Sequence, residues 1–188
     1  MNKSTIIALF ARGREIGFVV MHRGKIVRYG VKTITGRRRG RTFVEGIEKA
    51  LADVLSLAGP QGVIVAETHK LAHHQGALCR VLADIFKRWE RRGLGVCYLS
   101  LEEVKESLCR NQKATHSELV EAVADRYPPL QSLITGATIE GQKYWQKVFV
   151  AMGLAEVVWA RPQQKNATDC FLYVGVRFCR MTRGGDNT

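Results

Sequence analysis

The chain has 188 residues and a mass of 21.1 kDa, the size of one domain that carries at most one sizeable insertion. Its 46% apolar and 24% charged residues exclude a disordered protein, and no apolar stretch approaches the ~18 residues that span a bilayer. A net charge of +12, from 29 Lys and Arg against 17 Asp and Glu, makes nucleic acid the first partner to consider.

Three extended segments open the predicted fold: Thr5–Phe10, Ile16–His22 and Lys25–Thr33. The second and third are predicted to form a hairpin, because Arg23 and Gly24 supply a tight turn between runs of β-branched and aromatic residues. The chain therefore begins with an antiparallel sheet.

Helices and short apolar strands alternate through the next part of the chain. Helices are predicted from Thr42 to about Gly59, from Gly76 to Arg92, after Ser100 and after Thr115, with strands at Val63–Ala66 and Gly95–Leu99. Three of these helices follow a capping-box pattern, in which Thr42, Ser100 or Thr115 precedes a Glu by three residues. This order predicts an α/β fold whose later strands are joined by right-handed crossovers.

The segment Gln131–Gln164 has no pattern that determines its form. It combines helical spacing around Glu140–Gly153 with an apolar stretch at Ala155–Ala160. Helical spacing returns at Asn166–Met181, and residues 183–188 are predicted to be a frayed polar tail. We expect one domain over 1–188, without internal repeats.

The cysteines are scattered, at Cys79, Cys97, Cys109, Cys170 and Cys179. Their odd number and the lack of a close C-x-x-C pair predict buried thiols. Arg12 and Arg14 interrupt the first apolar run, so no secretory signal is expected and the protein is predicted to be cytoplasmic. An anionic membrane, the rival partner for a basic chain, is disfavoured because the N-terminus has no myristoylation pattern.

Three parts of the chain carry a resemblance to a known family. The most specific is Gly95–Tyr127, a strand followed by a helix with Glu103-Val104-Lys105 and a second helix start at Gln112–Leu119. The opening hairpin and the Val63–Glu67 strand match in spacing. Together they resemble the ribonuclease H-like superfamily, and within it the RuvC-type Holliday junction resolvases. The resemblance implies a mixed sheet, antiparallel over its first three strands and then parallel, flanked by helices, with 131–164 as an insertion.

The resemblance also implies a metal site, which is incomplete in this sequence. In the family, acidic residues hold two Mg²⁺ ions that clamp the attacking water and the leaving oxygen of a phosphodiester. Glu67 and Asp169 match two of these acids. Phe10 stands where the family has the aspartate that bridges both ions, and Lys165 and Asn166 stand near another acid. A phenyl ring offers no oxygen ligand, so the usual two-ion geometry is not expected to form.

Simpler interpretations of these acids stay open. The helix macrodipole alone would favour Asp169, and Glu67 could be a solvated strand end. Glu15 could replace the missing ligand, but it lies beyond the turn that follows the first strand. A histidine group follows the Val63–Glu67 strand, at His69, His73 and His74. Loop histidines without Cys or Asp partners contact phosphate or water more often than a metal.

Basic residues predict the DNA contacts: Arg37, Arg38, Arg39, Arg41, Lys70, Lys105, Lys113 and His116. The first four form a compact cationic loop, and the last three fall where the family places basic groups near the scissile phosphate. Cationic side chains suit phosphate because each contact releases condensed counterions. A solvated, solubilising surface is the alternative for any one charge run. The family's aromatic wedge is replaced around Lys70 and Leu71, which puts selectivity for four-way junctions in question.

We therefore expect a resolvase-like DNA-binding protein without nuclease activity and without a cofactor. It would serve as a recognition or scaffolding factor in DNA recombination or in plasmid, phage or conjugative-element DNA processing, alongside protein partners. The alternative is a divergent, structure-selective endonuclease with Mg²⁺ as cofactor. An RNA-binding protein is disfavoured by the lack of aromatic RNP-type motifs. A homodimer is expected from the two-fold resolvases and from the apolar residues of the Gly76–Arg92 helix.

Overall fold

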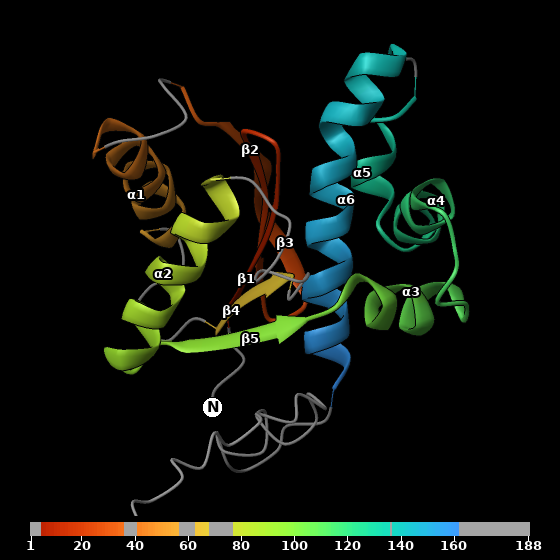
Figure 1. Cartoon of the computed structure of the whole chain (residues 1–188). Helices are drawn as coiled ribbons and strands as arrows, with labels where there is room; N and C mark the ends of the chain where they lie inside the picture. Colours follow the sequence, from red (N-terminus) through yellow and green to blue (C-terminus); the bar gives the residue numbers. More distant parts are fainter. Residues whose placement is uncertain (1–4, 36–40, 57–62, 68–76, 136, 162–188) are drawn as a thin grey trace, which may run out of the picture.

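The computed structural model describes residues 5–35, 41–56, 63–67, 77–135 and 137–161 (Figure 1). The strands are β1 (Thr5–Arg12), β2 (Glu15–His22), β3 (Lys25–Thr33), β4 (Val63–Glu67) and β5 (Gly95–Leu99). The helices are α1 (Arg41–Leu55), α2 (Ala77–Arg91), α3 (Leu101–Cys109), α4 (His116–Arg126), α5 (Pro128–Gln131) and α6 (Ile139–Ala160).

The five strands form one mixed sheet in the order β3-β2-β1-β4-β5. β1, β2 and β3 are antiparallel neighbours, and β4 runs parallel to both β1 and β5. The predicted sheet is therefore confirmed, including the change from antiparallel to parallel pairing. Two consecutive positive φ angles, 49° at Arg23 and 78° at Gly24, make the tight turn of the predicted hairpin.

Helices cover both faces of the sheet. α1 and α2 pack on one face, while α6 lies on the other and separates the sheet from α4 and α5 (Figure 1). Side chains alternate along β1, so that Ile6, Ala8 and Phe10 join the core under α6. Ile7 and Leu9 join the core under α1 and α2. The two cores are thus separated by the sheet itself.

α6 runs through the segment whose form the sequence pattern leaves undetermined. Residues from Lys147 to Val158 are buried almost without interruption, because the sheet, α3 and α4 enclose the helix. A helix buried on all sides has no polar face, so the 3.6-residue period that would predict it is lost. Its description as an insertion stays a prediction, but the segment is a central part of the core rather than an appendage.

Local signals at the helix starts have mixed outcomes. Ser100 and Thr115 form the predicted capping boxes with Glu103 and Glu118. The third prediction is wrong: α1 already begins at Arg41, so Thr42 lies inside its first turn instead of capping it. The predicted helix at 166–181 and the tail at 183–188 lie outside the described residues.

The predicted burial of the cysteines is only partly confirmed. Cys79 is buried, whereas Cys97 and Cys109 are half-buried, and Cys170 and Cys179 lie outside the described residues. None of the described helices combines the length and apolar character that a membrane crossing requires.

Candidate functional site

The carboxyl ends of the neighbouring parallel strands β1 and β4 define the candidate site. Leu9 pairs with Ala66 in the β1–β4 register, so Phe10 and Glu67 follow directly at adjacent strand ends. By strand alternation, Glu67 shares its face with Val63 and Val65, which belong to the core under α6. Phe10 and Glu67 therefore project to the same face of the sheet, as the resemblance implies.

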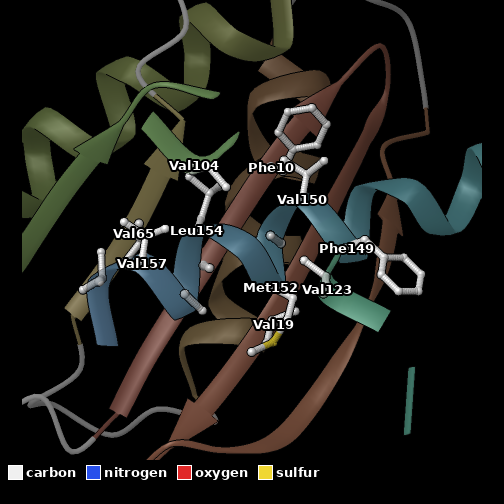
Figure 2. Close-up of a cluster of buried hydrophobic side chains, with 14 of the residues drawn as sticks. Phe10, Val19, Val65, Val104, Val123, Phe149, Val150, Met152, Leu154 and Val157 are labelled. Atoms are coloured by element: carbon white, nitrogen blue, oxygen red, sulfur yellow. The ribbon is translucent and has the colours of Figure 1, made fainter. Parts of the chain in front are cut away.

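Phe10 is part of the core rather than of an open site. Its side chain is only 5% exposed, and Figure 2 shows it with Val150 of α6 in one buried cluster. Its partner across the β1–β2 pair is Gly17, where α6 comes close to the sheet. A Cβ atom at Gly17 would lie 2.4 Å from the carbonyl oxygen of Lys147, so only glycine permits this approach. α6 thus packs directly over the carboxyl end of β1 and buries Phe10 there.

Glu67 contrasts with Phe10. Its Oε1 atom is buried and has no hydrogen-bond partner among the described residues. The pKa of Glu67 is raised from 4.5 to about 7, mainly by burial and to a lesser extent by the nearby Glu102 carboxylate, while the positive charge of Arg12 partly opposes both. The strand end therefore carries a poorly solvated carboxyl group that is close to half-protonated at neutral pH.

Arg12 connects this carboxyl group with a second group of basic residues. Arg12 follows Phe10 by two residues on the same face of β1, and its charge acts on both Glu67 and His116. Burial lowers the pKa of His116, and the positive charges of Lys105 and Arg12 lower it further. The structure thus brings the predicted residues Lys105 and His116 together with Arg12.

A cleft of about 1210 Å³ opens beside Phe10, between the β1–β2 turn, the start of α4 and the first turns of α6. Its basic residues are Arg12, Arg14, Lys143 and Lys147, and its acidic residues are Glu15 and Glu121. Glu15, the possible replacement ligand, instead forms an ion pair with Lys147, whose Nζ lies 2.7 Å from the Glu15 Oε2. The cleft is therefore cationic overall.

The other predicted contact residues lie apart from this cleft or outside the described structure. Arg41 is almost fully exposed and pairs with Glu45 one helical turn away at 2.7 Å, and Lys113 is exposed before α4. The predicted residues outside the described ranges are Arg37, Arg38, Arg39, Lys70, Asp169, His69, His73, His74, Lys165 and Asn166.

The described donors do not fit a pair of Mg²⁺ ions. Hard divalent cations need several oxygen ligands, and the strand ends offer Glu67 and the more distant Glu102 against Arg12 and Lys147. Within the residues that the structure describes, no three His, Cys, Asp or Glu side chains lie close enough together to hold a metal ion. The buried ring of Phe10, at the end of β1, offers no oxygen ligand either.

Several residues of the site were not predicted from the sequence. Arg12 could have been predicted, because a residue two positions after Phe10 on a strand points to the same face of the sheet. Lys143 and Lys147, one turn apart on α6, required the helix to be recognised first. Glu102 lies in the first turn of α3, and its effect on Glu67 depends on how α3 packs beside β4, which the sequence pattern does not give.

The mixed sheet in the order β3-β2-β1-β4-β5, with α1 and α2 on one face and α6 on the other, is a ribonuclease H-like fold of the RuvC type. Among solved structures, the chain is similar to Thermus thermophilus RuvC, with a TM-score of 0.58 and 13% identity over 83% of this chain and 94% of that one. It is similarly close to T. thermophilus RuvC in complex with Holliday junction substrate, with a TM-score of 0.57 and 13% identity over 81% and 90% of the two chains. No protein-family model and no curated protein matches the chain. At this identity the likeness establishes the fold.

Proposed function

We propose that this protein is a resolvase-like DNA-binding protein that does not cut DNA by the two-metal reaction. The observation that carries the proposal is the burial of Phe10 in the core, at the strand end where the resemblance implies a metal-bridging aspartate. Two Mg²⁺ ions act by holding both oxygens of an in-line displacement, which requires carboxylates on both sides of the pair. With Phe10 at the end of β1, that side of the ion pair has no carboxylate ligand.

Binding is supported by features that do not depend on a metal. The chain has a net charge of +12, and Arg12, Lys105 and Lys143 add cations around the strand ends. One of the similar structures is RuvC with Holliday junction DNA, which makes branched DNA the first ligand to try. The role that follows is recognition or scaffolding in recombination or mobile-element DNA processing.

The test is the salt dependence of DNA binding by the full chain. Affinity should fall steeply between low and physiological salt, with a log–log slope of about −0.9 per phosphate contacted. Replacing Arg37, Arg38, Arg39 and Arg41 together by Ala should flatten this slope. The matched control replaces four exposed cations at the α2 end of the molecule, Arg80, Lys87, Arg91 and Arg92. An unchanged slope in the loop variant, or an equal change in both variants, would remove the loop from the interface.

One observation favours the alternative, a divergent Mg²⁺-dependent endonuclease. The buried Oε1 of Glu67 has no hydrogen-bond partner among the described residues, as expected of a carboxylate arranged for a cation. Glu67 with Glu102 and Asp169 would be the ligands to consider. Calorimetric titration of the full chain with Mg²⁺ separates the two functions. Our proposal expects no saturable heat, whereas saturable heat that disappears in Glu67→Gln would favour the nuclease.

A homodimer is also part of the proposal, although the apolar residues of α2 no longer support it. Leu82 and Ile85 of α2 are buried within the same chain, and Val81 and Trp89 are half-buried against that core. Excess apolar surface on α2 therefore no longer argues for a dimer, and the remaining support is the resemblance to two-fold resolvases. Light scattering should give twice the chain mass of 21.1 kDa, and a clean monomer mass with and without DNA would end this part of the proposal.

A further inference from the structure

The cleft beside Phe10 has two chemically different walls. Cations from the end of β1 and the first turns of α6 form one wall, which we call the cationic wall: Arg12, Arg14, Lys143 and Lys147. Aliphatic residues of α4, the segment after α5 and the start of α6 form the other, which we call the apolar wall: Val120, Ile134 and Ile139. Figure 1 shows α4 and α5 beyond α6, on the side of that helix away from α1 and α2.

Two residues of the cationic wall are available for an anionic ligand. Arg12 and Lys143 are exposed and form no ion pair with any described residue. Lys147 is held by Glu15 at 2.7 Å and donates to the Lys143 carbonyl oxygen at 3.0 Å, so its position is well determined. His116 and Ser117, in the first turn of α4, also line the cleft and turn the positive end of that helix toward it.

The apolar wall is unusual for a protein with this surface charge. Ile139 is 72% exposed, which makes it one of the few large apolar side chains that the described structure leaves in water. Val120 and Ile134 are half-buried beside it in the same cleft. A ligand with apolar surfaces as well as negative charges would remove these side chains from water while neutralising the exposed cations of the same cleft.

The volume of the cleft narrows the class of ligand. At about 1210 Å³ it exceeds the ~300–1,000 Å³ typical of sites for small molecules, so a segment of a polymer fits it better than a single metabolite. A DNA duplex is a poor match for the apolar wall, because its base faces are stacked inside and only base edges and phosphates are presented. An unpaired strand offers both phosphates and free base faces.

We propose that this cleft binds an unpaired strand of DNA, with its phosphates on the cationic wall and its base faces against the apolar wall. The inference rests on the proposed DNA-binding function and adds to it a preference for DNA that contains an unpaired segment. Phe10 lies at the base of the cleft, where its burial leaves the strand facing cations rather than metal ions.

The experiment compares the affinity of the full chain for three labelled DNAs of one sequence: a single strand, a blunt duplex and a duplex with an unpaired tail. The single strand and the tailed duplex should bind more tightly than the blunt duplex. Ile139→Ser should weaken single-strand binding by about three- to tenfold, as expected for the loss of a base contact, and should weaken duplex binding much less. Lys143→Ala should also reduce the single-strand salt slope by about 0.7.

Val27→Ser is the matched control, because Val27 is another exposed aliphatic residue (62%) but lies on β3 and does not line the cleft. This variant should bind all three DNAs as the unmodified protein does. Equal affinity for blunt and tailed duplexes, or a single-strand affinity that Ile139→Ser leaves unchanged, would overturn the inference while DNA binding stands. A protein that binds none of the three DNAs would instead refute the proposed function itself.

Discussion

The ends of β1 and β4 are neighbours in the sheet but differ in almost every physical respect. At the β1 end, Phe10 is buried, and α6 approaches so closely that its Lys147 carbonyl oxygen lies over Gly17. At the β4 end, Glu67 keeps a carboxyl group whose Oε1 has no hydrogen-bond partner among the described residues. One end is hydrophobic core, and the other carries a buried carboxyl group.

The two strand ends also differ in how they affect stability. Core packing stabilises the β1 end, since Phe10 buries a large apolar side chain under α6. At the β4 end, burial of Glu67 disfavours its charged form and so opposes folding at neutral pH. The following predictions test the two ends separately, from the largest expected effect to the smallest.

Phe10→Asp should have the largest effect, because it removes a buried ring and introduces a carboxyl group without partners. We expect a loss of about 4 kcal/mol or more in the free energy of unfolding, measured by urea denaturation, and no gain of nuclease activity. Phe10→Leu, which keeps an apolar side chain, should cost only about 1 kcal/mol. If Phe10→Asp were as stable as the unmodified protein, the β1 end could not be a closed core.

Gly17→Ala tests how tightly α6 closes the β1 end. The new methyl group would meet the backbone of Lys147 at 2.4 Å, so α6 must shift, and we expect a loss of roughly 3 kcal/mol. Gly46→Ala in α1 is the control, because its new Cβ would have an ordinary 3.8 Å contact with Ile34. That helical substitution should stabilise the protein by roughly 0.5–1 kcal/mol. Equal effects of the two substitutions on thermal unfolding would contradict a close contact at Gly17.

Glu67→Gln tests the β4 end through pH. The folded protein binds the Glu67 proton more tightly than the unfolded chain, with a pKa of about 7 against 4.5, so this group lowers stability progressively as pH rises between these values. Glu67→Gln should therefore be more stable than the unmodified protein by about 3 kcal/mol at pH 8, and by almost nothing at pH 4.

Urea denaturation across this pH range provides the measurement, with Glu106→Gln on the exposed surface of α3 as the control. The control should change stability by less than about 0.5 kcal/mol at any pH. A Glu67→Gln difference that does not depend on pH would mean that the carboxyl group is well solvated, and the contrast between the two strand ends would disappear.

The smallest expected effect concerns DNA affinity. Glu67→Ala and Asp169→Ala should leave the affinity unchanged or raise it by up to about fivefold, because each removes a carboxyl group that the resemblance places near the bound phosphates. Fluorescence anisotropy at low salt measures this. A large loss of affinity in either variant would place the carboxyl group in direct support of binding, as in a metal-bridged contact.

Local sequence signals predicted the parts of this fold that local chemistry determines. The hairpin at Arg23 and Gly24 and the caps at Ser100 and Thr115 are correct because turn and cap residues act on their own neighbours. Helical spacing around Glu140–Gly153 indicated only part of α6, since its later turns are enclosed on all sides and have no amphipathic period. Its burial is a property of the assembled core.

The same division holds for the site. Strand order and spacing place Phe10 and Glu67 at neighbouring strand ends, and the position of Lys105 near His116 follows from the resemblance. The cleft depends on α6, so Lys143 and Ile139 could not be assigned to it before the fold was known. Contacts between distant segments, rather than residue type, make this half of the site.

The most direct test of the account is a cleavage assay on a branched DNA duplex in the presence of Mg²⁺, in a sample whose binding to that DNA is measured at the same time. The account predicts that the unmodified protein binds the branched duplex and leaves both strands intact, because Phe10 is buried where the resemblance implies a bridging carboxylate. Nicking that requires Mg²⁺ and disappears in Glu67→Ala would contradict it and establish the nuclease alternative.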